Sequence, residues 1–135
     1  MTDVRVNAAV TAENQAAVFD VRELEERCFG NSELVERILA QVETEVEREC
    51  QTLSDAVQQA DRTLLATAAH RLKGTAANIG ATRIKKAVDS IEDASRDLAP
   101  WSQLEKMFQE VHEEQVRLIE VVNRHVTRQM NGDEV

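Results

Sequence analysis

Apolar residues recur every three or four positions along most of this 135-residue chain, a spacing that places them on one face of an α-helix. The spacing predicts helices over residues 21–29, 32–59, 62–78 and 81–98, and a long final helix that starts near residue 101. The longest stripe contains Leu34, Val35, Ile38, Leu39, Val42, Val46, Cys50, Leu53 and Val57. We expect residues 21–128 to form one helical domain, after a loose leader over 1–20 that could hold a short helix, and before a frayed tail over 129–135.

Residues that commonly begin or end helices stand between these runs. Helix-capping side chains are Asp20, Asn31 or Ser32, and Asp61, while Gly30 and Gly80 follow predicted helix ends and Pro100 opens the final helix. Connections this short force successive long helices to run antiparallel. The sequence therefore predicts an all-α fold, an antiparallel up-down four-helix bundle with a short additional N-terminal helix.

Composition narrows the classes of partner. Sixteen Lys and Arg against 25 Asp and Glu give a net charge of −9, which argues against binding to nucleic acid or to an anionic membrane. No stretch approaches the apolar length of a membrane span, and the N-terminus lacks the order of a signal peptide, so we expect a cytoplasmic location. We also expect the bundle to be a monomer. Cys28 and Cys50 are too isolated to indicate a metal site, and we expect two free thiols.

The predicted helix over residues 62–78 differs from an ordinary amphipathic helix. Its apolar stripe comprises Leu64, Leu65, Ala68, Leu72, Ala76 and Ile79, and His70 lies about 170° from the centre of that stripe. The residues that share the face of His70 are all small: Thr63, Ala66, Thr67, Gly74 and Ala77. An exposed histidine is usually inert, but a solvated face would normally carry larger polar side chains.

Gly74 strengthens the case that this face is functional. A glycine inside a helix costs about 1 kcal/mol relative to alanine, so its presence requires a reason. The simplest reason is that another molecule approaches closely one turn after His70. Lys73 adds a positive charge within a turn of the imidazole.

The segment His70-Arg71-Leu72-Lys73-Gly74 resembles the H-x-L-K-G signature of the histidine-containing phosphotransfer (HPt) domain, and the likeness of helix order extends over about residues 21–126. The resemblance implies that His70 accepts and donates a phosphoryl group in a two-component multistep phosphorelay. It also implies receiver domains of response regulators or hybrid sensor kinases as partners, which would supply the aspartate and Mg²⁺. The small residues around His70 would let a receiver close over it and exclude water.

The resemblance also suggests roles for residues near His70. In HPt domains a Gln or Glu on the next helix orients the imidazole, and Glu92 occupies that place here. Glu92 could equally form an ion pair with Arg96, four residues later. Lys73 would neutralise a phosphoryl oxygen, or would be a solvated lysine. For partner docking we predict Thr67, Gly74, Ala77, Lys85 and Arg96, although Lys85 and Arg96 are also compatible with plain surface charge.

Other functions are less compatible with the sequence. It has no Gly-rich nucleotide loop and no dedicated acidic cluster for Mg²⁺, so we expect no intrinsic cofactor or metal and no autonomous kinase activity. A di-metal carboxylate bundle requires Glu three residues before a metal-binding His, but Thr67, Gln109 and Val122 occupy that position before the three histidines. The remaining alternative is a non-catalytic helical adaptor that binds receiver or kinase domains without phosphotransfer.

Overall fold

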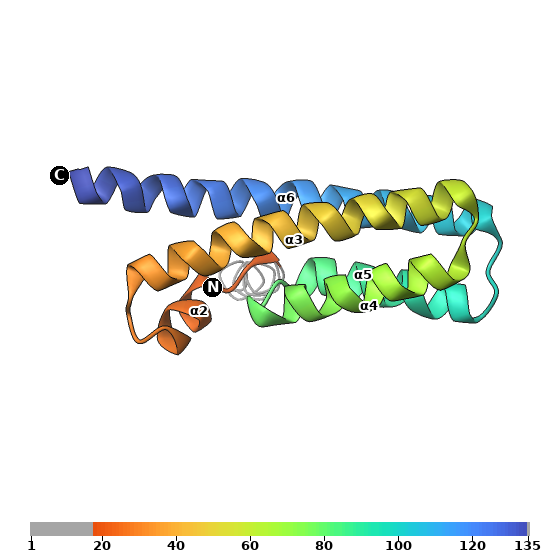
Figure 1. Ribbon diagram of the computed structural model, residues 1–135, viewed down its shortest axis with the longest axis horizontal. Helices are drawn as coiled ribbons and strands as arrows, with labels where there is room; N and C mark the ends of the chain where they lie inside the picture. Colours follow the sequence, from red (N-terminus) through yellow and green to blue (C-terminus); the bar gives the residue numbers. More distant parts are fainter. Residues whose placement is uncertain (1–17, 135) are drawn as a thin grey trace, which may run out of the picture.

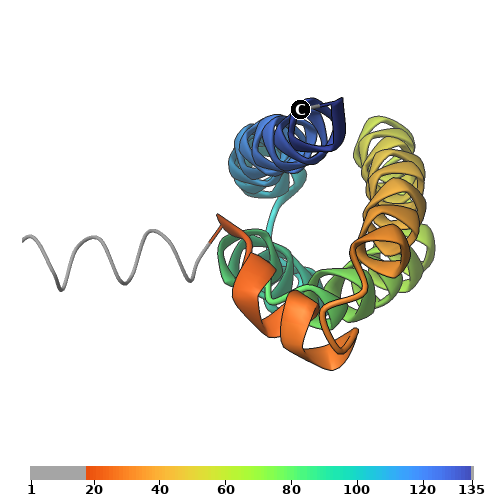
Figure 2. The same ribbon diagram turned by 90° about the vertical axis from the view of Figure 1, so that its left-hand side faces the viewer.

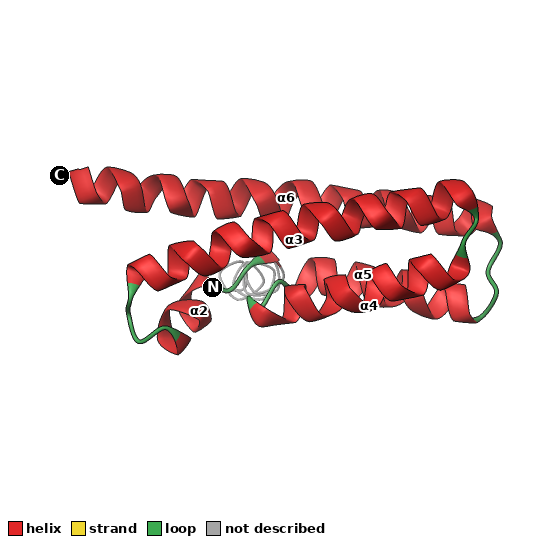
Figure 3. Cartoon of the chain, viewed as in Figure 1, coloured by secondary structure: helices red, strands yellow, loops and turns green. Residues whose placement is uncertain are grey.

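A computed structural model of the chain describes the backbone of residues 18–134 and the side chains of residues 18–126. Within these residues the structure is helical throughout, with no strand (Figure 3). The helices are α2 (Val21–Arg27), α3 (Ser32–Gln59), α4 (Arg62–Asn78), α5 (Thr82–Arg96) and α6 (Trp101–Glu134). The predicted all-α class is confirmed, and none of the described helices is long and apolar enough to cross a membrane.

The four long helices form an antiparallel ring. Helix α3 packs against α4 and α6, and α5 packs against the same two neighbours from the opposite corner (Figures 1 and 2). The short α2 contacts α3 at one end of the bundle. Two residues join α3 to α4 and three join α4 to α5, so each helix reverses direction at once. The predicted up-down bundle with a short N-terminal helix is therefore confirmed.

Local side-chain chemistry sets the helix starts. The side-chain oxygen of each predicted cap accepts a hydrogen bond from the backbone N–H three residues later, at 3.0–3.1 Å. The pairs are Asp20 with Glu23, Asn31 with Leu34, and Asp61 with Leu64. Each bond satisfies a donor that the first helical turn leaves without a partner. The ranges predicted for α3 and α4 agree with the structure.

Several predicted ends differ from the structure. Helix α2 ends at Arg27 rather than residue 29, and α5 covers 82–96 rather than 81–98. Both helices end early because a non-glycine residue adopts left-handed backbone just after each end: Phe29 has φ of 55° and Leu98 has φ of 60°. The backbone of α6 remains helical to Glu134, where the sequence predicted a frayed tail. Of the predicted leader, residues 1–17 lie outside the described residues.

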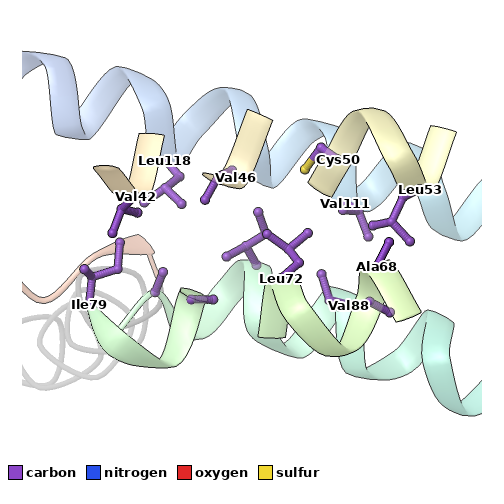
Figure 4. Packing of buried hydrophobic residues seen from close by; sticks show 14 of the residues in the cluster. Val42, Val46, Cys50, Leu53, Ala68, Leu72, Ile79, Val88, Val111 and Leu118 are labelled. Carbon is purple, nitrogen blue, oxygen red and sulfur yellow. The ribbon is translucent and has the colours of Figure 1, made fainter. Parts of the chain in front are cut away.

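The core runs along the centre of the ring, and each of the four long helices contributes to it. Its members include Val42, Val46, Cys50, Leu53, Ala68, Leu72, Ile79, Val88, Val111 and Leu118 (Figure 4). Both cysteines are buried free thiols, as the sequence predicts. Burial, together with the nearby charge of Glu49, raises the pKa of the Cys50 thiol to about 12.

Asp20, just before α2, and Arg27, the last residue of α2, hold the end of the bundle where α4 turns into α5. The backbone N–H of Asp20 donates to the carbonyl of Ile79 at 3.2 Å, and the Arg27 guanidinium donates to the carbonyl of Asn78. Gly80 makes this turn with φ of 66°. A Cβ on Gly80 would lie 2.8 Å from the Cβ of Asp20. This glycine therefore meets both a conformational and a steric requirement.

We predict that Gly80→Ala destabilises the protein more than Gly30→Ala does. Both glycines have positive φ, which costs an alanine about 1–2 kcal/mol, but a Cβ on Gly30 has no neighbour within 4 Å. The contact with Asp20 should add about 1–3 kcal/mol for Gly80→Ala. Urea unfolding of the two variants measures the difference, and equal losses would contradict the close packing of residue 20 on the turn.

Candidate functional site

His70 lies midway along α4 and is exposed, as the sequence predicts. The opposite side of the helix fills the bundle core with Leu65, Ala68, Leu72 and Ala76, each fully buried. Ala69 and Thr75 are also buried, which the predicted stripe did not include, because α4 packs against α3 as well as against α5. The helix that carries the imidazole is therefore held on two sides, and only its outer face is free.

The outer face of α4 is bare, as expected. Thr63, Thr67, Gly74 and Ala77 are exposed, and Ala66 is partly buried. A Cβ built on Gly74 meets no atom within 4 Å, so nothing inside the described part of the molecule requires glycine at this position. The cost of a mid-helix glycine is not offset by internal packing. The described residues therefore fit the sequence-based expectation that another molecule approaches closely at Gly74.

Lys73 connects α4 to α5 through two carboxylates. Its Nζ donates to Glu92 Oε1 at 2.8 Å and to Asp89 Oδ1 at 3.2 Å. The hydrogen bond to Glu92, and then the one to Asp89, raise the pKa of Lys73 above its ordinary value of 10.5. Asp89 was missed by sequence reasoning, although it stands one turn before Glu92 and thus on the same side of the helix. The ammonium is charged and anchored near the site.

Glu92 is buried, with 2% of its side chain exposed, and each of its oxygens faces a cation. Oε1 accepts from Lys73, and Oε2 lies 3.4 Å from a guanidinium nitrogen of Arg96. The pairing with Arg96 that the spacing suggested is therefore present. The hydrogen bonds found among the described residues include none between Glu92 and His70.

A surface hollow nevertheless brings Glu92 and the imidazole together. It is lined by Ala66, Thr67, His70, Arg71, Glu92 and Arg96. Four residues of the predicted site thus meet between α4 and α5: His70, Glu92, Thr67 and Arg96. Of the other predicted docking residues, Ala77 is exposed further along α4, and Lys85 is exposed on α5 outside the lining of this hollow.

The structure also gathers acidic groups that the sequence did not reveal as a cluster. Carboxylate oxygens of Asp89, Glu92 and Asp93 lie within 4.8 Å of one another. Their charges face cations of the chain itself, since Lys73 binds the first two residues and Arg96 lies 3.4 Å from Glu92 and 3.9 Å from Asp93. This arrangement is a network of ion pairs beside the exposed imidazole.

Comparison with known proteins decides the family. The model of the family described as "Hpt domain" matches residues 37–121, well over half of the chain, and this range contains the whole site described above. The chain belongs to the Hpt domain family. Hpt domains are the phosphotransfer carriers of phosphorelays, and the chain is such a carrier. No curated protein sequence matches it.

Two solved structures share the fold of this Hpt domain. The HPT domain of a sensor hybrid histidine kinase from Shewanella matches with a TM-score of 0.71 at 17% identity, over 84% of this chain and 97% of its own. Histidine-containing phosphotransfer protein B from Pseudomonas aeruginosa PAO1 matches with a TM-score of 0.72 at 18% identity, over 82% of this chain and 96% of its own. Such likeness shows that the bundle architecture is shared despite low identity.

We predict that Glu92→Gln lowers the pKa of Lys73 more than Asp89→Asn does, because the bond to Glu92 contributes most to the raised value. NMR titration of the lysine side chain measures both shifts. Because the pKa is higher in the folded than in the unfolded chain, the ion pairs stabilise the fold below about pH 10.5, and this contribution is lost as the pH rises through the folded pKa. Equal shifts in the two variants would contradict the dominant role of Glu92.

Proposed function

We propose that His70 is the residue that accepts and donates the phosphoryl group of this carrier. The observation that supports this best is the exposed imidazole on a bare face of α4, beside a hollow that contains a buried carboxylate and a guanidinium. The chain has two other histidines, His112 and His125, both on α6. Neither belongs to the H-x-L-K-G segment or lines the hollow with Glu92.

The reaction needs one nucleophile from this chain and the remaining groups from a partner. A neutral ring nitrogen of His70 attacks the phosphorus of an aspartyl phosphate, a P–N bond forms, and the P–O bond to the aspartate breaks. The aspartate leaves as a carboxylate, and the second ring nitrogen of His70 retains its proton. Mg²⁺ held by the partner receiver domain would neutralise the phosphoryl oxygens during transfer in either direction.

The transfer would be assisted by a change in the ion pairs of Glu92, which the structure pairs with Lys73 and Arg96. The phosphoryl group brings negative charge to the hollow, where Arg96 is the exposed cation on Glu92. If Arg96 turns towards the phosphoryl oxygens, Glu92 Oε2 becomes available to accept a hydrogen bond from the protonated ring nitrogen. Glu92 would then orient the imidazole and stabilise its positive charge. Lys73 would keep its hydrogen bond to Glu92 Oε1 and add positive charge beside the site.

We further propose that the partners are receiver domains of response regulators or hybrid sensor kinases, which dock on the face formed by Thr67, Gly74, Ala77 and Arg96, with Lys85 at its margin. The carrier would work as a cytoplasmic monomer, with no kinase activity and no cofactor of its own. The net charge of −9 fits a protein partner that presents Mg²⁺ better than a nucleic acid or a membrane.

The first test is the phosphorylated residue. Incubation with a phosphorylated receiver domain should label the wild type with an acid-labile, base-stable phosphate, and His70→Gln should remove that label. His112→Gln, which changes an exposed histidine outside the site, is the matched control and should be labelled normally. A folded wild type that binds several receivers without ever acquiring the label would favour the adaptor.

The second test concerns clearance at Gly74. Gly74→Lys should raise the free energy of unfolding by about 0.5–1 kcal/mol, because lysine favours a helix and its Cβ meets no neighbour. Transfer from a phosphorylated receiver should nevertheless slow at least tenfold, because a long side chain would block the approach. Gly74→Ala should give a similar gain in stability with a smaller loss of rate. Unchanged transfer by Gly74→Lys would show that the partner does not come close at this position.

A further inference from the structure

A second hollow lies on the other side of α4, between this helix and α3. It is lined by Glu45, Arg48, Glu49, Arg71, Gly74, Thr75 and Asn78. Arg71 lines both this hollow and the one that contains His70 and Glu92, so the two are adjacent across the face of α4. Gly74, whose missing side chain nothing in the described molecule explains, borders the α3 side rather than the α5 side.

Glu49 is a buried carboxylate in this second hollow, with 6% of the residue exposed. Its one ion pair among the described residues is with Arg71, at 4.0 Å, and the Arg71 side chain is 66% exposed. The hydrogen bonds of the described residues include none to Glu49. Removing a carboxylate from water is costly unless a close cation or several donors compensate for the lost hydration. The Glu49 oxygens are not among the fully enclosed, unpartnered polar atoms of the described residues, so they keep contact with water in the hollow, and the nearest cation that pairs with them is Arg71.

Glu92, the other buried glutamate among the described residues, has two close cations. Glu92 has Lys73 at 2.8 Å and Arg96 at 3.4 Å. Beside Glu49, the hydroxyl of Thr75 faces other acceptors instead, Glu45 Oε2 and the carbonyl of Arg71, each at 3.2 Å. Arg48 also lines the hollow, but the ion pairs and hydrogen bonds of the described residues include none between Arg48 and Glu49. The Glu49 carboxylate can therefore accept a further cation.

We propose that Glu49 is a docking anchor that binds a Lys or Arg side chain of the receiver domain while that domain covers His70. This inference rests on the proposed function of His70. A partner that closes over the imidazole must also pass over Gly74, one turn along α4, and there it reaches the hollow that Glu49 lines. The cationic side chain would gain a charge-assisted hydrogen bond in a site that is already largely shielded from water.

The experiment measures transfer from one phosphorylated receiver domain at increasing receiver concentration, for the wild type, Glu49→Gln and Glu47→Gln. Glu47 is an exposed glutamate of the same helix outside the hollow and serves as the matched control. Glu49→Gln should raise the half-saturating receiver concentration about tenfold or more, with little change in the rate at saturation, because the anchor takes no part in the chemistry. Glu47→Gln should behave like the wild type.

Thermal unfolding and a small-molecule phosphate donor separate docking from folding and from chemistry. Glu49→Gln should melt close to the temperature of the wild type, since it gives up only the 4.0 Å ion pair with an exposed Arg71, and phosphoramidate should label its His70 at the wild-type rate. If Glu49→Gln does not fold, Glu49→Asp replaces it. This variant keeps the charge but moves it back by one methylene, and it should also raise the half-saturating receiver concentration.

The outcomes distinguish the two proposals. A wild type that transfers normally together with a folded Glu49 variant whose half-saturating concentration is unchanged would overturn the anchor and leave the carrier role intact. A wild type that neither a receiver nor phosphoramidate labels at His70 would overturn the proposed function itself. A loss of receiver affinity confined to the Glu49 variants supports the anchor.

Discussion

Helix α4 must pack against both α3 and α5 and still leave a face uncovered, and the site depends on this constraint. Leucines and alanines fill the contacts on the buried sides, which fixes the rotation of the helix about its axis. With the rotation fixed, His70 can only point outward, and the small residues of its own face cannot cover it. A carrier that must be approached by another protein needs this combination of rigid support and open access.

The two flanks of α4 differ electrostatically. On the α5 flank, each carboxylate oxygen of Glu92 already pairs with a cation of the chain, next to the imidazole. On the α3 flank, the one ion pair of Glu49 among the described residues is with an exposed Arg71 at 4.0 Å. The first flank is suited to stabilising charge during the reaction, because its groups are already positioned. The second is suited to recognition, because its carboxylate gains a close partner only when another protein arrives.

Most of the fold could be predicted because its determinants are local. Apolar spacing and the caps Asp20, Asn31 and Asp61 act within a few residues, so the bounds of α3 and α4 agree with the structure. The partners of Lys73 could not be predicted in the same way, since Asp89 and Glu92 are 16 and 19 residues distant and meet it only through packing. The left-handed turn at Ala60 was also missed, because alanine carries no signal for it.

The buried thiols have a practical consequence for studying this carrier. Cys28 and Cys50 are the chain's two cysteines, both are enclosed in the core, and the pKa of about 12 leaves Cys50 almost wholly unionised near neutral pH. Since the thiolate is the reactive form, alkylating dyes should spare Cys50 while the bundle stays folded. A single cysteine engineered at a solvent-facing position could then carry a fluorophore without first removing the native ones, and would report on complex formation in real time.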